Sequence, residues 1–165
     1  MIRKLSRAIR EYKRDTVLTP VTAAMEVVME VIIPVLMAFL IDRGINAGDM
    51  DTIWRTGLLL VLCALVSMAF GVLSGFFGAR ASTGFARNLR QDMYYAVQKY
   101  SFSNIDKFST GSIVTRLTTD VTNLQNTFQM LIRIAVRAPS TLIFSMVMAF
   151  LVNARLALLF LAVIP

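Results

Sequence analysis

The chain has 165 residues, 56% of them hydrophobic, and its mean hydropathy is +0.65. This apolar content exceeds the roughly 45–50% of soluble domains and is concentrated in long runs, which indicates membrane-spanning helices rather than one soluble core. The absence of histidine excludes His-dependent catalysis and His-based metal sites, the single cysteine excludes an intrachain disulfide, and no lysine follows a glycine, so the chain has no P-loop.

The N-terminal segment, residues 1–15, is predicted to be an amphipathic basic elbow helix. Ile2, Leu5, Ile9 and Tyr12 are spaced three, four and three apart, and basic residues fill the opposite face. Such a helix lies in the membrane interface, with its charges toward anionic lipid and its apolar side chains toward the acyl chains. A disordered basic tail is the alternative.

Apolar runs long enough to cross a bilayer follow. Because a helix rises about 1.5 Å per residue and the hydrocarbon core is about 30 Å thick, about 20 residues suffice. Residues 16–41 form the first predicted span, 42–52 an extracellular loop, and a second span begins at residue 53. The third run ends at Val152 and reaches spanning length if Arg133 or Arg137 lies near the headgroups.

The last residues of the sequence predict a further crossing. Residues 153–155 form an extracellular turn, and residues 156–165 are the start of a fourth span, which we expect to be truncated at Pro165.

The basic residues are distributed as in a multi-pass membrane protein. Six of the 17 lie in the N-terminal segment and eight lie between Arg80 and Arg137, whereas residues 42–55 hold two. Because Lys and Arg stay preferentially on the cytoplasmic side, we expect a cell-membrane protein with a cytoplasmic N-terminus. The net charge of +7 is therefore interpreted as a topology signal and not as a nucleic-acid surface.

The second and third spans are predicted to continue far into the cytoplasm. A helical apolar period extends beyond Arg80, so residues 53–100 form one element, and a matching period makes 111–152 its return. The apolar positions are Phe85, Leu89, Met93, Ala96 and Tyr100 on the outgoing helix and Ile113, Leu117, Val121, Leu124 and Phe128 on the returning one.

The tip of this stalk, residues 101–110, carries one apolar edge among polar residues. Phe102, Ile105 and Phe108 are three apart, which favours a short helix that docks into a groove of a partner domain. Closure of the hairpin on itself is the alternative. The residues predicted to contact the partner are Phe102, Asn104, Ile105, Asp106, Lys107 and Phe108.

The residues after the tip resemble a motif of ABC exporters. Residues 108–121 read FSTGSIVTRLTTDV, which is similar to the pattern that follows the first coupling helix of that family and includes Gly111, Arg116 and Asp120. Residues 41–45 after the first span, Arg137-Ala138-Pro139 and residues 153–165 add to the resemblance. It covers essentially the whole chain.

The resemblance implies an all-α polytopic membrane helix bundle with long intracellular helix extensions. It makes residues 101–110 the first coupling helix, which would dock on a nucleotide-binding domain that binds ATP and Mg. That domain would lie in the same or another chain, and a second half-transporter would complete a homo- or heterodimer. The chain itself would bind no cofactor and catalyse nothing, whereas the parent protein would export a drug, lipid or peptide by alternating access. The alternative is a small membrane scaffold that binds a cytosolic partner through residues 101–108 and transports nothing.

Two acidic residues in the first span form the other candidate site. Glu26 and Glu30 are four apart and therefore share one helix face. A charged residue at the bilayer centre costs at least about 2.5 kcal/mol, so the pair should face a wet cavity, a cation or the bundle interior. Either the two carboxylates line a substrate cavity that attracts cations or protons, or they pair with Arg133 or Arg137. Gly71 and Gly75 on the second span are predicted to permit close helix packing.

Overall fold

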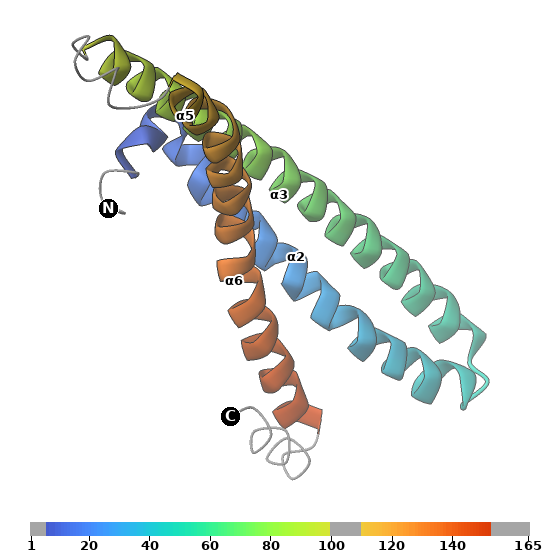
Figure 1. Ribbon diagram of the computed structural model, residues 1–165. Helices are drawn as coiled ribbons and strands as arrows, with labels where there is room; N and C mark the ends of the chain where they lie inside the picture. The colour runs from blue at the N-terminus through green and yellow to red at the C-terminus, as the bar shows by residue number, and fades with distance from the viewer. Residues whose placement is uncertain (1–5, 100–109, 153–165) are drawn as a thin grey trace. The chain divides into compact units, whose positions relative to one another are not determined.

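The computed structural model of the chain describes residues 6–99 and 110–152. These residues are almost entirely helical and include no strand (Figure 1), which confirms the predicted all-α class. The elements are the 3-10 helix η1 (Ser6–Tyr12), α2 (Lys13–Phe39), the π-helix η2 (Leu40–Ile45), α3 (Met50–Gln98), α5 (Thr110–Thr115), the π-helix η3 (Arg116–Asp120) and α6 (Val121–Val152).

Among the described residues, three helical stretches are long and apolar enough to cross a membrane: Ala8–Ile45, Met50–Gln98 and Gly111–Val152. The second of these is the single helix α3, 49 residues long. The apolar period that runs past Arg80 therefore belongs to the same helix as the span.

The chain divides into two compact units, and each contains parts of α2, α3 and α6. The first, here called the stalk unit, comprises Met1–Thr19 and Gly75–Arg133. The second, the span unit, comprises Pro20–Ser74 and Ile134–Pro165.

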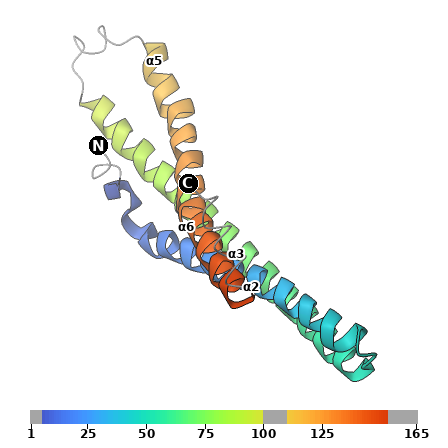
Figure 2. The same cartoon turned by 90° about the horizontal axis from the view of Figure 1, so that it is seen from below.

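The stalk unit has a small core of its own. On α3, Ala81, Phe85 and Ala86 are buried, and the ring of Phe85 stacks on that of Phe128 of α6, with centroids 4.7 Å apart. Figure 2 shows α5 and the beginning of α6 running beside the last turns of α3. Ser82 adds a polar contact, since its hydroxyl donates to Oε1 of Gln129 over 3.4 Å.

The described part of the N-terminal segment is a short 3-10 helix that leads into α2. Residues Ser6–Tyr12 form 3-10 turns, and Arg10, at φ 38° and ψ −112°, interrupts the helical path before α2 begins at Lys13. Side chains with a Cβ seldom adopt such a conformation, so contacts of this segment with α3 must hold it. The described part of the predicted elbow helix is thus helical with a break at Arg10, and the placement of the segment in the membrane interface stays a prediction.

The helix that returns from the tip consists of α5, η3 and α6, and near its start it is wound more widely than an α-helix. In the π-helix η3 the hydrogen-bond ladder of the backbone is displaced, and threonine hydroxyls bond to nearby carbonyls. Thr115 donates to the carbonyl of Gly111 over 3.0 Å, Thr118 to that of Val114 over 2.8 Å, and Thr122 to that of Thr118 over 2.9 Å. Such bonds to carbonyls of the preceding turn compete with the backbone ladder, and this threonine-rich stretch departs from regular α-helical winding.

The span unit joins α2 to α3 by a tight connection. Gly48 has φ 67°, which favours glycine, and Asp49 caps α3 by accepting hydrogen bonds from the hydroxyl of Thr52 and the backbone N–H of Asp51. The hydrogen bonds from Thr52 lower the pKa of Asp49, because they stabilise the carboxylate form. Beyond this turn the unit exposes much apolar surface, including Leu58, Leu65 and Val72 of α3 and Leu142 and Leu151 of α6.

Candidate functional site

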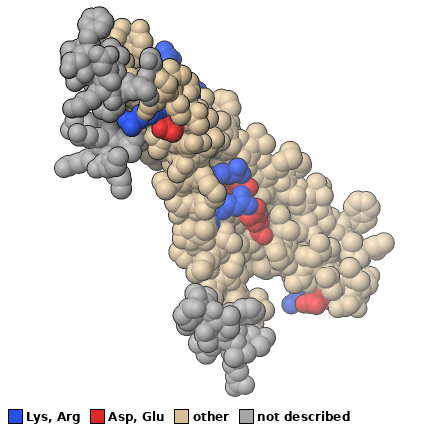
Figure 3. Space-filling view, in the orientation of Figure 1, with Lys and Arg blue, Asp and Glu red and all other residues tan. Residues whose placement is uncertain are grey.

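The two intramembrane carboxylates of α2 converge on one arginine of α6, and all three residues lie in the span unit. Nη1 of Arg137 donates to Oε1 of Glu26 over 2.9 Å, and Nη2 donates to Oε1 of Glu30 over 2.6 Å. The spacing of four residues on α2 places both carboxylates on one face, so the planar guanidinium can bond to both at once. On the face shown in Figure 3, acidic and basic atoms adjoin one another within a surface of other residues.

The three members of this triad differ in exposure. Glu26 is buried, at 8%, whereas the side chains of Arg137 and Glu30 are 34% and 42% exposed. The second oxygen of Glu26, Oε2, is inaccessible and has no hydrogen-bond partner within the described part of the chain. Two carboxylates therefore share one guanidinium, and the buried one is only half satisfied.

Gly71 of α3 provides the room for the Glu26 carboxyl group. A Cβ at position 71 would lie 3.1 Å from Oε1 and 3.7 Å from Oε2 of Glu26. The missing side chain of Gly71 thus lets the Glu26 carboxyl group lie against the backbone of α3. Gly75 has no such neighbour, since nothing lies within 4 Å of a Cβ at that position. The role of Gly71 is more specific than the general helix packing that the sequence predicted.

The sequence left two partners open for the carboxylates, and the structure selects one of them. Arg137 makes both ion pairs, and Arg133 is in none of the ion pairs found among the described residues. The pairing does not exclude a role for Glu26 and Glu30 in a substrate cavity, which stays a prediction.

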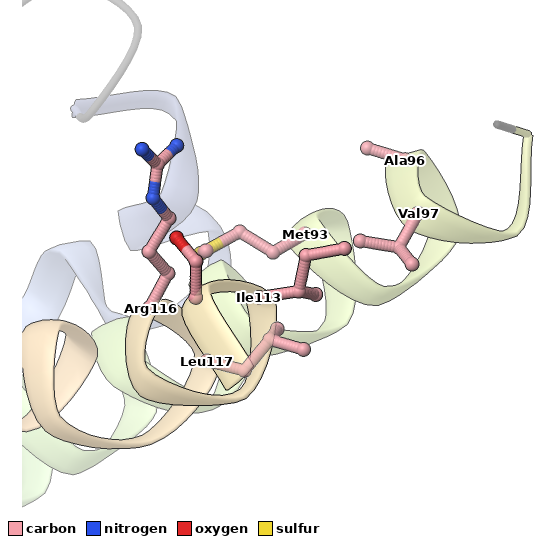
Figure 4. Close-up of a pocket in the computed structure, with 7 residues that line it drawn as sticks. Met93, Ala96, Val97, Ile113, Arg116 and Leu117 are labelled. Carbon is pink, nitrogen blue, oxygen red and sulfur yellow. The ribbon is translucent and has the colours of Figure 1, made fainter. Parts of the chain in front are cut away.

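The predicted partner-contact residues Phe102, Asn104, Ile105, Asp106, Lys107 and Phe108 lie outside the described residues. In the stalk unit, α3 and the helix that returns from the tip line a small apolar pocket of about 130 Å³ (Figure 4). Its lining residues are Met93, Ala96, Val97, Ser112, Ile113, Arg116 and Leu117.

The three motif residues after the tip have few described contacts. Arg116 lines the pocket, with its guanidinium directed away from Val97 and Ile113 in Figure 4. Arg116 and Asp120 are not paired in the described ion pairs, although they are four apart. No described atom lies within 4 Å of a Cβ built on Gly111. The predicted role of these three residues as a structural motif after the tip stays a prediction.

One face of α3 in the stalk unit holds the N-terminal segment, and sequence reasoning missed it. Arg80, Gly84, Asn88 and Asp92 are spaced four apart and form a stripe that we call the clasp. Nδ2 of Asn88, which is 3% exposed, donates to the carbonyl oxygen of Ala8 over 2.9 Å. This bond satisfies a buried backbone group next to the break at Arg10.

Three further contacts complete the clasp. Arg10 pairs with Asp92 at 2.6 Å, and Asp15 lies 3.5 Å from the guanidinium of Arg80. The ring of Tyr12 packs directly on Gly84, where a side chain would overlap it. The period of four was visible in the sequence, but the partners of these residues lie far away in the N-terminal segment, up to 82 positions along the chain, and could not be identified from it.

Comparison with known proteins decides the family. The family model for the ABC transporter transmembrane region matches residues 16–165, nearly the whole chain. The chain belongs to this ABC transporter family. It is 34% identical over 140 residues to an uncharacterized ABC transporter ATP-binding protein of Bacillus subtilis, an alignment that covers 85% of this chain and 24% of that protein.

Other ABC transporter relatives are more distant. An uncharacterized ABC transporter ATP-binding protein of Mycobacterium tuberculosis is 26% identical over 98% of this chain and 28% of its own length. An ATP-dependent lipid A-core flippase of Pseudoalteromonas translucida is 25% identical over 79% of this chain and 22% of its own. The chain thus spans about a quarter of the length of these relatives.

Among the residues that the structure covers, no group of three or more His, Cys, Asp or Glu side chains is placed to hold a metal ion. In the described part of the span unit, ion pairs join Arg55 to Asp51 and Arg137 to Glu26 and Glu30. The chain is a multi-pass helical membrane segment with a charged triad in its spans and a long helical stalk.

Proposed function

We propose that this chain is the first part of the membrane domain of an ABC exporter, which moves a drug, lipid or peptide by alternating access. ATP hydrolysis would occur on a nucleotide-binding domain that holds ATP and Mg, in the same or another chain, and a second half-transporter would complete the translocation path. The names of the relatives support this proposal, since they include ATP-binding proteins and lipid A-core flippases.

The observation that carries the proposal is the length of α3. At about 1.5 Å per residue, its 49 residues extend about 70 Å, more than twice the roughly 30 Å of the hydrocarbon core. Half of the helix therefore lies beyond the spans. An extension of this length reaches a domain well outside the bilayer, and it ends at the segment that carries Phe102 and Phe108.

In this mechanism the stalk transmits movement. Nucleotide binding and release would shift the docked tip, residues 101–110, and α3 and the returning helix would carry that shift toward the spans as stiff rods. A two-state change in helix packing is the usual form of such coupling. The N-terminus and the tip would lie on the cytoplasmic side, as the distribution of basic residues favours.

A substrate-independent assay tests the proposal on the full-length protein in lipid nanodiscs. A single cysteine at Met29, on a Cys63→Ala background, is labelled with maleimide with and without ATP and Mg. We expect ATP to change the labelling rate at least severalfold, and the additional changes Phe102→Ala and Phe108→Ala to abolish that response. A rate indifferent to ATP would support the non-transporting scaffold instead.

A further inference from the structure

The N-terminal segment is broken at a residue whose neighbours favour a helix. Residues 6–14 read SRAIREYKR and contain neither glycine nor proline, and most of them are good helix formers. Arg10 nevertheless has φ 38° and ψ −112°, a conformation that side chains with a Cβ seldom adopt. The composition of the segment therefore does not cause the break, and contacts with another element must impose it.

The clasp on α3 supplies contacts on both sides of the break. Before it, the carbonyl oxygen of Ala8 accepts a hydrogen bond from Asn88 over 2.9 Å. After it, the ring of Tyr12 packs on the glycine of the clasp. At the break itself, the guanidinium of Arg10 pairs with Asp92 at 2.6 Å. The clasp thus holds the backbone in a form that the segment does not favour by itself.

The clasp is also a surface that the segment can leave. Its residues Arg80, Asn88 and Asp92 are polar or charged, and the fourth is a glycine. Release of the segment therefore uncovers groups that water can hydrate, and it exposes no large apolar side chain of the clasp. The stacked rings of Phe85 and Phe128 belong to a separate contact between α3 and α6, which release leaves in place.

The composition of the segment indicates what it binds when it leaves the clasp. As a continuous helix it would carry Ile9 and Tyr12 on one face and Arg10 and Arg14 on the opposite one. Residues 6–14 hold four basic residues and a single acidic one. An anionic lipid surface matches both faces, because its headgroups attract the basic side chains and its acyl chains accept the apolar ones.

We propose that residues 6–15 are a two-state element for which the clasp and anionic lipid compete. In one state the element is broken at Arg10 and lies on α3. In the other it is a continuous helix on the membrane surface, where a lipid phosphate replaces Asp92 as the partner of Arg10. Because α2 begins within this element, at Lys13, anionic lipid regulates how firmly the start of α2 is tied to α3 in the stalk unit.

A disulfide reports on the clasped state. Because the Tyr12 ring would overlap a Cβ at position 84, cysteines that replace Tyr12 and Gly84 come within disulfide range when the segment lies on α3. The pair is introduced into the full-length protein on a background without other cysteines, which includes Cys63→Ala. The protein is reconstituted without nucleotide in nanodiscs of phosphatidylcholine, alone or mixed equally with phosphatidylglycerol. The rate of disulfide formation under mild oxidation is followed by maleimide labelling of the remaining thiols.

We expect the anionic lipid to slow disulfide formation at least about fivefold, the factor that a single basic residue contributes near an anionic surface. Asp92→Asn removes the ion pair of Arg10 and should slow the reaction about twofold further in the mixed nanodiscs, where the released state prevails. The matched control is Asp51→Asn, which breaks the exposed pair with Arg55 in the span unit and should change neither rate.

Equal rates in the two kinds of nanodisc would overturn the proposal, because the segment would then be a fixed part of the stalk unit. If the cysteine pair forms no disulfide even in phosphatidylcholine, hydrogen exchange of the unmodified protein decides. The amides of residues 10–13 should exchange severalfold more slowly in the mixed nanodiscs, because a continuous helix closes the break at Arg10. Identical exchange in both lipids would contradict the two states.

Discussion

The stalk unit and the span unit use polar groups in opposite ways. In the stalk unit, Asn88 and Ser82 are buried beside Phe85 and Ala86, and the described hydrogen bonds of these polar groups link neighbouring segments. In the span unit, the strongest polar link is the ion triad on Arg137, while large apolar side chains such as Leu58 and Leu142 remain exposed. The stalk unit packs against itself, whereas the span unit needs lipid or other helices to cover it.

This difference indicates where each unit is sensitive to change. A unit that packs on itself should respond most to altered shape, because its interior leaves little free space. A unit whose helices are joined by charges should respond most to the loss of one partner, because the remaining charge is left buried. Each prediction below concerns thermal unfolding of the full-length protein in detergent.

The largest effect is expected in the span unit. Arg137→Ala leaves the buried Glu26 carboxylate without its guanidinium and should destabilise the protein by about 2–3 kcal/mol. The value lies below that of a fully buried pair because a third of the Arg137 side chain is exposed. The control Arg55→Ala breaks an exposed pair and should cost less than about 0.5 kcal/mol. Equal effects of the two changes would contradict the claim that the buried Glu26 carboxylate makes the span unit sensitive to the loss of its partner.

The next effect tests shape in the stalk unit. Gly84→Val places a side chain where the Tyr12 ring packs and should destabilise by about 1–3 kcal/mol. Gly75→Ala on the same helix is the control, since nothing lies within 4 Å of a Cβ there and alanine favours helix by up to about 1 kcal/mol. A neutral Gly84→Val would show that the N-terminal segment does not pack on α3 in the full-length protein.

A smaller effect isolates one hydrogen bond of the clasp. Asn88→Ala removes the donor to the carbonyl oxygen of Ala8 and should cost about 1–2 kcal/mol, because a buried acceptor loses its partner. Limited proteolysis adds a local readout, since the N-terminal segment should be cleaved earlier in this variant. Unchanged cleavage together with unchanged unfolding would show that the hydrogen bond from Asn88 does not hold the N-terminal segment on α3.

The smallest effect concerns the cap of α3. The folded-state pKa of Asp49 is lowered by hydrogen bonds from Thr52, so its contribution to stability is present above the unfolded pKa of about 3.9 and is lost as pH falls through the folded value. Asp49→Asn should therefore lower the melting temperature slightly at pH 7 and much less near pH 3. The same small loss at both pH values would assign the effect to cap geometry rather than to charge.

The local pattern of the sequence predicted the elements well. The long apolar runs and the helical period beyond Arg80 sufficed for the all-α class, because these signals depend only on neighbours along one helix. The pairing of Glu26 and Glu30 was predicted as one of two roles, but Arg133 and Arg137 could not be separated, since they lie four apart on α6.

The features that the sequence could not predict depend on residues far apart in the chain. The clasp joins Ala8 to Asn88, and the break at Arg10 replaces part of a helix that the apolar spacing favoured. The close fit of Gly71 to the Glu26 carboxyl group likewise depends on how α2 and α3 pack. Glycine spacing alone indicated close packing without indicating what occupies the space.

The central claim is that the stalk connects the spans to a domain that hydrolyses ATP. The most direct test replaces Ile105 with a photo-crosslinking phenylalanine analogue in the full-length protein in native membranes, followed by mass spectrometry of the adducts. The account predicts one dominant adduct with a nucleotide-binding domain, and a shift in its yield when ATP and Mg are added. Adducts only with lipid, or with a cytosolic protein that binds no nucleotide, would contradict the account.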